Sequence, residues 1–445
     1  MYTKEYREEE LCGWGNYPCT HGNVFRPERI ADLSEILSKE RMTVLARGGG
    51  TSYGDASINA DGLNIDTKRL NKMLHFDSSN GILHCQSGVT LQEIIRTFLP
   101  RGWFLSVTPG TQFGTVGGCT ACDSHGKNWK DGSFSSYVKG FNLMLHDGSI
   151  IYCDEKNNSN MYYATFGGMG MTGIILDVCI ELKNISSSYV EVETVRFNNL
   201  KELFDLIQES WNSYHYLFSW IDSHKEGNNM GRGILQRANH VNDGDLHYTE
   251  RKRISIPFNL PGFVINRYSV ETFNALFYTK ASFDKNRKRL HLMDYFYPLD
   301  GIADWYRVYG RKGFLQYQVA IPNDNAFETI SDLLKIIART KLGSTVAAIK
   351  PILKSKGLLS FPINGFTLAV DFAYNEETRQ LLDELDRIVT SNGGRVYLAK
   401  DARLNADNFA KMYSESLLEW ETVRKEYGVT NIFNSLMFNR LRGFK

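Results

Sequence analysis

The chain has 445 residues with 51 basic and 50 acidic side chains, so its formal net charge is +1. Nucleic-acid-binding proteins usually carry a basic excess, so this balance argues against that class of protein. Hydrophobic residues make up 42% of the chain and aromatic residues 13%, which predicts a folded globular protein of two or three domains.

The sequence offers no membrane-spanning or secretory segment. No run of about 18 uncharged apolar residues occurs, so we expect no transmembrane helix. Residues 1–10 are charged and acidic, and they lack the basic start and apolar core of a secretory signal. We therefore expect a cytoplasmic protein, or one held peripherally at a membrane surface.

The seven cysteines are odd in number and scattered along the chain. This pattern favours reduced thiols over a disulfide framework. Cys119 and Cys122 match a C-x-x-C spacing, but no second ligand pair and no thioredoxin-like context accompany them. We interpret both as small packing residues and expect no metal site.

The first predicted elements form one α+β unit that ends near residue 75. Apolar residues at helical spacing predict a helix over 26–37, with Pro27 in its first turn. Short apolar runs predict buried strands at 43–46 and 63–66.

A glycine-rich segment follows the strand at 43–46. Residues 47–55 read Arg-Gly-Gly-Gly-Thr-Ser-Tyr-Gly-Asp. Glycine lacks a Cβ, so the backbone N–H groups of such a loop can approach a phosphate closely. A second small-residue loop at 108–111 leads into Thr-Val-Gly-Gly at 115–118, and more glycines follow at 167–173. Two such loops, tens of residues apart, suggest a dinucleotide held between two subdomains.

Short strands and loops alternate between residues 82 and 182, and aromatic residues become dense from about 190. Strands are predicted at 82–85, 141–145, 149–153, 174–182, 314–322 and 366–373, with a tight turn at Asp147–Gly148. Helices are predicted over 91–98, 200–211, 325–338 and 376–390. Residues 225–290 look irregular, and there an apolar, aromatic stretch at 254–277 lies between basic clusters at 251–253 and 285–289.

The two glycine loops resemble the FAD-binding domain of the vanillyl-alcohol-oxidase / p-cresol-methylhydroxylase superfamily. Further stretches are similar to its decaprenylphosphoryl-β-D-ribose 2-oxidase branch, and they lie at 125–128 (His-Gly-Lys-Asn), 313–318, 359–363 and 399–401 (Ala-Lys-Asp). The resemblance extends from Gly13 to about Leu441. It implies an α+β fold with an FAD-binding domain over 1–187, split into two subdomains near 75. It also implies a substrate domain over 188–394, with an antiparallel sheet flanked by helices, and a C-terminal segment, 395–445, that returns to the FAD domain.

The resemblance also implies the FAD-binding residues. They are Arg47, Gly48, Gly49, Gly50, Thr51, Ser52, Tyr53, Pro109, Gly110, Thr111, Thr115, Gly117, Gly118, Cys122, Asp123, His125, Gly126, Asn128, Gly173 and Ile175. The amides of the two glycine loops are expected to contact the pyrophosphate. Many superfamily members tether the flavin through a histidine at the position of Thr51, and no histidine lies between His21 and His75, so we expect dissociable FAD.

Two residues are expected to be catalytic. Lys400 would stabilise the negative charge that develops on the flavin, although a structural ion pair with Asp401 would also explain a lysine there. His125 could accept the proton of the alcohol, or it could hydrogen-bond the flavin without titrating.

The substrate pocket is implied in the same way. Its residues are Tyr53, Lys127, Trp220, Tyr317, Gln318, Lys350, Phe361, Ala369 and Lys400. Gln316 and Gln318 would share one face of a strand, so spacing does not choose between them, and Gln318 is favoured by resemblance. Trp220 and Phe361 could equally be core residues. Ala369 stands where the family usually has a cysteine. Phe296 stands where it usually has a histidine. The stretch at 254–277 could be a mobile lid over a lipid tail, or an ordinary loop.

By resemblance, the expected reaction is FAD-dependent oxidation of the ribose C2 hydroxyl of a polyprenylphosphoryl-ribose, the first half of epimerisation to an arabinose donor. A separate NAD(P)H-dependent short-chain reductase would complete the inversion. One alternative is a soluble polyol or aldonolactone oxidase, and another is a flavin-binding scaffold without catalysis.

Overall fold

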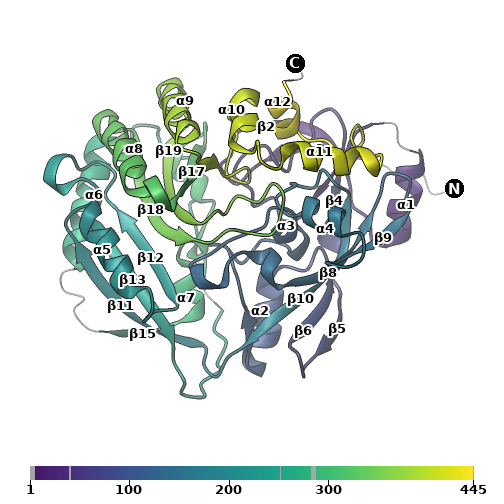
Figure 1. Cartoon of the computed structure of the whole chain (residues 1–445), viewed down its shortest axis with the longest axis horizontal. Coiled ribbons are helices and arrows are strands. Elements are labelled where there is room, and N and C mark those ends of the chain that lie inside the picture. The colour runs from purple at the N-terminus through teal and green to yellow at the C-terminus, as the bar shows by residue number, and fades with distance from the viewer. Residues whose placement is uncertain (1–5, 40–41, 251, 282–286, 444–445) are drawn as a thin grey trace.

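The computed structural model describes residues 6–39, 42–250, 252–281 and 287–443 (Figure 1). Helices and mainly antiparallel sheets occupy separate layers, so the expected α+β class is confirmed. Within the described residues, no helix is both long and apolar enough to cross a membrane.

The first sheet has the strand order β1-β2-β4-β3. Its strands are β1 (Arg7–Cys12), β2 (Cys19–Phe25), β3 (Val44–Arg47) and β4 (Leu63–Asp66). Helix α1 (Ile30–Lys39) buries Leu33 and Ile36 against the core. The helix begins at Ile30, later than the sequence predicted. The Asp32 carboxylate accepts a hydrogen bond from the Arg29 amide, and this contact caps the start of the helix.

The second sheet has the order β5-β6-β10-β8-β9, and β7 also pairs with β10. Its strands are β5 (Met73–Asp77), β6 (Ile82–Gln86), β7 (Trp103–Leu105), β8 (Val138–Met144), β9 (Ile150–Cys153) and β10 (Ile174–Asn184). The predicted hairpin is confirmed, since β8 pairs with β9 on either side of Asp147–Gly148. The helices of this part are α2 (Leu91–Phe98), α3 (Val116–Ala121) and α4 (Ser159–Thr165).

The third sheet is the largest, with the order β15-β11-β13-β12-β18-β19-β17-β20. Its strands are β11 (Tyr189–Phe197), β12 (Tyr216–Ile221), β13 (Gly233–His240), β15 (Lys288–His291), β17 (Phe314–Pro322), β18 (Gly343–Ile352), β19 (Gly365–Ala373) and β20 (Arg395–Val396). Helices α5 (Leu200–Ser210), α8 (Ala326–Thr340) and α9 (Glu376–Ser391) form a layer on it, with α8 in contact with both neighbours. Two short strands, β14 (Ile254–Ser255) and β16 (Ile302–Ala303), pair with each other, and α7 spans Leu292–Phe296.

The expectation that residues 225–290 are irregular was wrong. Strand β13 lies between β11 and β12, and helix α6 (Arg267–Lys280) starts at an Asn266 cap that pairs reciprocally with Ser269. The helical pattern was hidden because α6 has apolar residues on its outer side as well as its inner side. Before Lys400, only Arg395–Val396 pair as a strand, and the chain then turns.

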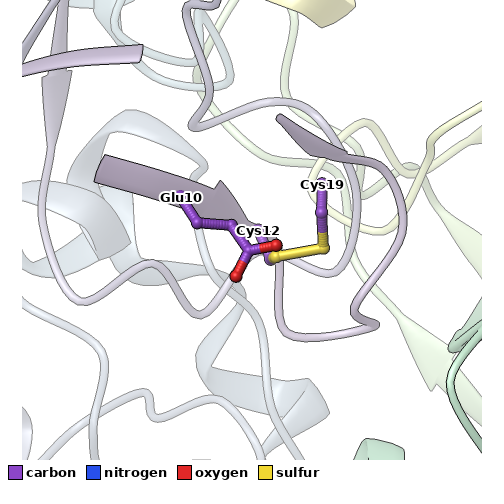
Figure 2. Close-up of side chains that lie close together, drawn as sticks. All are labelled: Glu10, Cys12 and Cys19. Atoms are coloured by element: carbon purple, nitrogen blue, oxygen red, sulfur yellow. A yellow bond between two sulfur atoms is a disulfide. The ribbon is translucent and has the colours of Figure 1, made fainter. Parts of the chain in front are cut away.

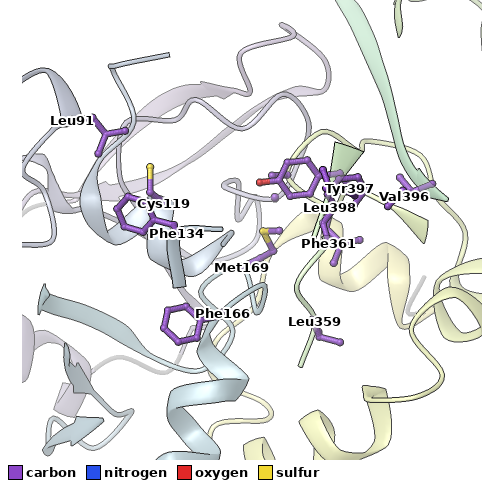
Figure 3. Packing of buried hydrophobic residues seen from close by; sticks show 14 of the residues in the cluster. Leu91, Cys119, Phe134, Phe166, Met169, Leu359, Phe361, Val396, Tyr397 and Leu398 are labelled. Carbon is purple, nitrogen blue, oxygen red and sulfur yellow. The ribbon is translucent and has the colours of Figure 1, made fainter. Parts of the chain in front are cut away.

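The C-terminal helices α10 (Ala406–Met412), α11 (Leu417–Glu426) and α12 (Leu436–Leu441) pack back towards the N-terminal half. Val44 bridges Phe433 in parallel, and the Leu436 amide donates to the Ile58 carbonyl. Figure 3 shows the shared apolar core, with Met169 facing Phe361 and Tyr397. These contacts support, as a proposal, the division into residues 1–187, 188–394 and 395–445.

The expectation of reduced thiols throughout was also wrong. Cys12 and Cys19 form a disulfide, with Glu10 beside it (Figure 2). The two residues face each other in the antiparallel register of β1 and β2, with Cα atoms 4.4 Å apart. Parity and scatter of cysteines do not reveal such a cross-strand pair. Cys119 is buried and Cys122 half-buried, and both are free.

We predict that denatured, unreduced protein titrates with thiol reagent as five thiols, those of Cys85, Cys119, Cys122, Cys153 and Cys179. After reduction the titre should rise to the seven cysteines of the chain. The measurement is a colorimetric thiol titration of freshly purified protein. A titre of seven before reduction would show that Cys12 and Cys19 are not bonded.

Candidate active site

A large cleft lies where the two glycine loops meet the inner face of the third sheet. Its walls include most of the expected cofactor and pocket residues. Those among its lining are Gly48, Gly49, Gly50, Thr51, Ser52, Tyr53, Pro109, Gly110, Thr111, Thr115, Gly117, Gly118, Cys122, His125, Lys127, Gly173, Ile175, Gln318, Lys350, Ala369 and Lys400. The expected residues outside the lining are Arg47, Asp123, Gly126, Asn128, Trp220, Tyr317 and Phe361.

The two glycine loops pack directly against each other. A Cβ on Gly48 would lie 2.2 Å from the Thr115 Oγ1, and one on Gly49 would lie 2.5 Å from the Phe113 carbonyl oxygen. Any side chain here would therefore push the loops apart. The Arg47 guanidinium braces the first loop by donating to the carbonyl oxygens of Ser57 and Cys12, 2.7 Å each, instead of lining the cleft.

The loops differ in the backbone donors that they offer. Among the described residues, the amides of Gly49, Gly50, Thr51 and Ser52 have no hydrogen-bond acceptor. The Gly117 amide donates to the Ser87 carbonyl (2.8 Å), and the Gly118 amide donates to the Thr115 hydroxyl (3.2 Å). Unpaired backbone donors facing a cleft are suited to an anion such as a diphosphate. The first loop therefore fits such a group through its amides, whereas the Gly117 and Gly118 amides are already paired within the chain.

The segment after α3 is held rigidly from behind. The buried Asp123 carboxylate accepts hydrogen bonds from the hydroxyls of Ser135 and Ser360, at 3.1 and 2.5 Å. Asn128 donates to the Ser106 carbonyl. Asp123 and Asn128 thus position the segment without lining the cleft. The sequence assigned them to the site because they belong to the matched motif, which does not show where their side chains point.

His125 projects into the cleft from this segment and is almost fully buried. Its Nε2 lies 3.1 Å from the Gln318 side-chain nitrogen, and its ring lies between those of Phe361 and Tyr397, with centroids 5.3 and 5.4 Å away. Burial, followed by the nearby Lys350 and Lys400, holds the pKa of His125 well below its ordinary value. The imidazole is therefore neutral near pH 7 and is a weaker base than an exposed histidine.

Three lysines reach the same cleft. The Lys127 ammonium contacts the rings of Phe218 and Tyr295, and it donates to the Tyr295 carbonyl. Lys350 donates to the Gly126 carbonyl (2.6 Å), and the Lys400 nitrogen lies 3.3 Å from the Tyr53 ring centroid. Burial lowers the pKa of each lysine to about 7.

None of these lysines lies within ion-pair distance of a carboxylate in the described part of the chain, but the nearby Asp371 charge opposes the effect of burial on the pKa of Lys400. The expected alternative of a Lys400–Asp401 pair is wrong, because the Asp401 carboxylate binds Arg440 at 2.9 Å. Burial leaves these lysines only partly protonated near pH 7, and an anionic ligand in the cleft would favour their charged forms.

Strand β17 places Gln316 and Gln318 on its cleft side and Tyr317 on its opposite side. Gln316 and Gln318 line the cleft from the same face, as the spacing predicted. Gln316 donates to the Asp371 carboxylate (2.6 Å), while Gln318 also contacts the Thr367 hydroxyl (3.2 Å). Tyr317 lies on the opposite face and donates to Asp386 (3.1 Å), so strand alternation itself excludes it from the pocket.

Trp220 and Phe361 are core residues, the alternative that the sequence left open. The Trp220 indole donates to the Thr345 carbonyl (2.7 Å) and packs with Ile234 and Tyr278. Phe361 stacks on Tyr397 behind His125. The sequence did not assign Trp14, Phe218, Gln316 or Phe296 to the lining. Two of these carried a signal, Gln316 by its spacing from Gln318 and Phe296 as a departure from the family motif.

Residues 23–154 match an FAD-binding domain family. Over 99% of its length, the chain is 31% identical to the whole of a decaprenylphosphoryl-β-D-ribose oxidase from Mycolicibacterium smegmatis. An L-gulonolactone oxidase from Mus musculus is 25% identical over 48% of this chain and 49% of its own. A D-arabinono-1,4-lactone oxidase from Candida glabrata is 22% identical over 44% of this chain and 38% of its own.

We predict that Lys127→Met makes the flavin-free protein more stable near pH 7, and that this advantage shrinks as the pH rises. Burial lowers the pKa of Lys127 from 10.5 to about 7. Between these values the unfolded chain binds a proton that the folded chain does not, so stability rises with pH across that window, and the full penalty applies below it.

Thermal unfolding of both proteins from pH 7 to 10 checks this prediction. The exposed Lys130→Met variant is the matched control and should follow the wild-type curve. A constant difference between Lys127→Met and wild type over the whole range would contradict the lowered pKa.

Proposed function

Because the chain belongs to the decaprenylphosphoryl-β-D-ribose oxidase family of FAD-dependent oxidoreductases, we propose that it oxidises the C2 hydroxyl of a polyprenylphosphoryl-ribose to the 2-keto sugar. The observation that carries the proposal is the convergence of Lys127, Lys350 and Lys400 on one cleft without carboxylate partners among the described residues. A sugar phosphate and a flavin diphosphate both supply the negative charge that such a cleft lacks.

Bound FAD would supply the acceptor for the hydride, which carries both electrons of the oxidation away from the carbinol carbon. The unpaired amides from Gly49 to Ser52 are suited to its diphosphate. Thr51 lines the cleft where many members of the superfamily carry the tethering histidine, so we propose that FAD is bound without a covalent link.

The three lysines, His125 and Gln318 have proposed roles. Lys127 and Lys350 bind the phosphate and the sugar hydroxyls, because both lie on the His125 side of the cleft, where Lys350 contacts the Gly126 carbonyl. Lys400 stabilises negative charge on the flavin. His125 accepts the hydroxyl proton at Nδ1, which has no hydrogen-bond partner among the described residues, while its Nε2 lies against the Gln318 side-chain amide. Ala369 lies opposite Gln318 in the register of β17 and β19 and leaves room for the sugar.

The polyol or aldonolactone oxidase alternative fits less well. The lactone-oxidase relatives match less than half of this chain, and a neutral substrate would leave Lys127 and Lys350 without an anionic partner. A scaffold without catalysis is disfavoured because His125 and Lys400 line the same cleft.

The product requires a partner. A 2-keto sugar becomes the arabinose epimer only when a hydride is delivered from the opposite face, so a separate NAD(P)H-dependent short-chain reductase is the proposed partner. A substrate with a prenyl chain resides in a membrane. We therefore propose that the reaction takes place at a membrane surface, with the protein in peripheral contact with it.

The test is anaerobic bleaching of the visible flavin absorbance of the FAD-loaded protein. Short-chain prenylphosphoryl-ribose should bleach it, whereas free ribose, xylitol and an aldonolactone should not. Lys400→Met should slow bleaching by about a hundredfold or more, as loss of a preorganised charge does, and the exposed Lys335→Met control should not. Bleaching by the free polyol or lactone, with none by the prenylphosphoryl sugar, would overturn the proposal.

A further inference from the structure

Exposed apolar side chains are concentrated on one segment. Of the 13 large hydrophobic side chains that are exposed in the described chain, seven lie between residues 254 and 277. We call these seven the α6 surface, and they are Ile254, Phe258, Phe263, Tyr268, Phe273, Leu276 and Phe277. Monomeric proteins rarely expose so many neighbouring aromatic side chains unless something covers them.

The fold does not need these side chains, because α6 is anchored by a different face. Val270, Asn274 and Tyr278 are buried on that face. The Asn274 amide donates to the Asp222 carboxylate (2.8 Å), and the Tyr278 hydroxyl donates to the Phe197 carbonyl (3.2 Å). Phe273, Leu276 and Phe277 lie beside this buried face, on a strip that remains exposed.

The α6 surface is continuous with the cleft. The Phe277 ring packs edge-on against Trp220, with centroids 4.9 Å apart. Trp220 pairs in register with Ala348, which lines the cleft. At the other end, Ile254 pairs with Ile302, close in sequence to the lining residue Asp300. The exposed strip therefore contacts Trp220, whose partner in the strand register lines the cleft.

The charge of the segment indicates what covers it. Between residues 252 and 280 the basic residues are Lys252, Arg253, Arg267 and Lys280, and the one acidic residue is Glu271. Aromatic and aliphatic side chains beside cations are the composition of segments that lie in the headgroup region of anionic bilayers.

We propose that the α6 surface docks on an anionic bilayer, so that the prenyl chain stays in the lipid while the phosphoribosyl group enters the nearby cleft. This inference rests on the proposed function for the identity of the substrate, but the docking itself is a separate property. The docking surface takes the place of the mobile lid that was expected over 254–277, because buried residues of helix α6 hold it against the third sheet.

The test is flotation of the FAD-loaded protein with phosphatidylcholine vesicles, with and without phosphatidylglycerol. We expect co-flotation with the anionic vesicles, weakened by high salt. Leu276→Glu and Phe263→Glu should each lower the bound-to-free ratio by about tenfold or more, because a charge replaces an inserted apolar group. Both residues are largely exposed, at 67% and 75%, so the fold should tolerate the change.

Leu418→Glu is the matched control, because Leu418 is 77% exposed on α11, outside the α6 surface, and it should float like wild type. Equal losses in all three variants, or no flotation of wild type, would overturn the inference. So would a concentration-dependent dimer that Leu276→Glu dissolves without any vesicle binding, since the surface would then belong to a second copy.

Detergent-dispersed short-chain substrate separates the two proposals. Oxidation of that substrate without flotation overturns the docking alone. Flotation without oxidation supports the docking and overturns the proposed function.

Discussion

The constraint on which the rest of the site depends is that three buried lysines share one cleft, none within ion-pair distance of a carboxylate among the described residues. Lys127, Lys350 and Lys400 come from segments far apart in the sequence, and burial lowers the pKa of each to about 7. A desolvated ammonium without a counter-ion costs folding free energy. Anionic ligands would supply the missing negative charge when they bind. The lysines therefore lower the stability of the ligand-free protein at a site that is needed for function.

The position of Lys400 depends on the C-terminal segment. Its neighbour Asp401 shares the Arg440 guanidinium with Asp55, at 2.9 and 2.8 Å. The Tyr53 amide donates to the Ala399 carbonyl (2.9 Å), and a Cβ on Gly54 would lie 1.9 Å from the Asp401 carbonyl oxygen. The segment that carries Lys400 is thus locked onto the first glycine loop, so the cation and the unpaired amides keep a fixed separation.

The sequence predicted the parts of this site that depend on local chemistry. The glycine loops, the strands at 314–322 and 366–373 and the shared face of Gln316 and Gln318 follow from glycine geometry and strand alternation. Asp123 and Trp220 were misplaced, because a motif match does not show whether a side chain faces the cleft or braces the segment from behind. The Cys12–Cys19 bond depends on hairpin register, which the sequence did not reveal.

The central claim is that the cleft stabilises negative charge on bound groups through fixed cations. The most direct measurement is the midpoint potential of the bound flavin in wild type and Lys400→Met, with the exposed Lys335→Met as control. The account predicts a lower potential in Lys400→Met alone, because reduction adds negative charge that Lys400 no longer stabilises. Equal potentials in all three proteins would contradict it.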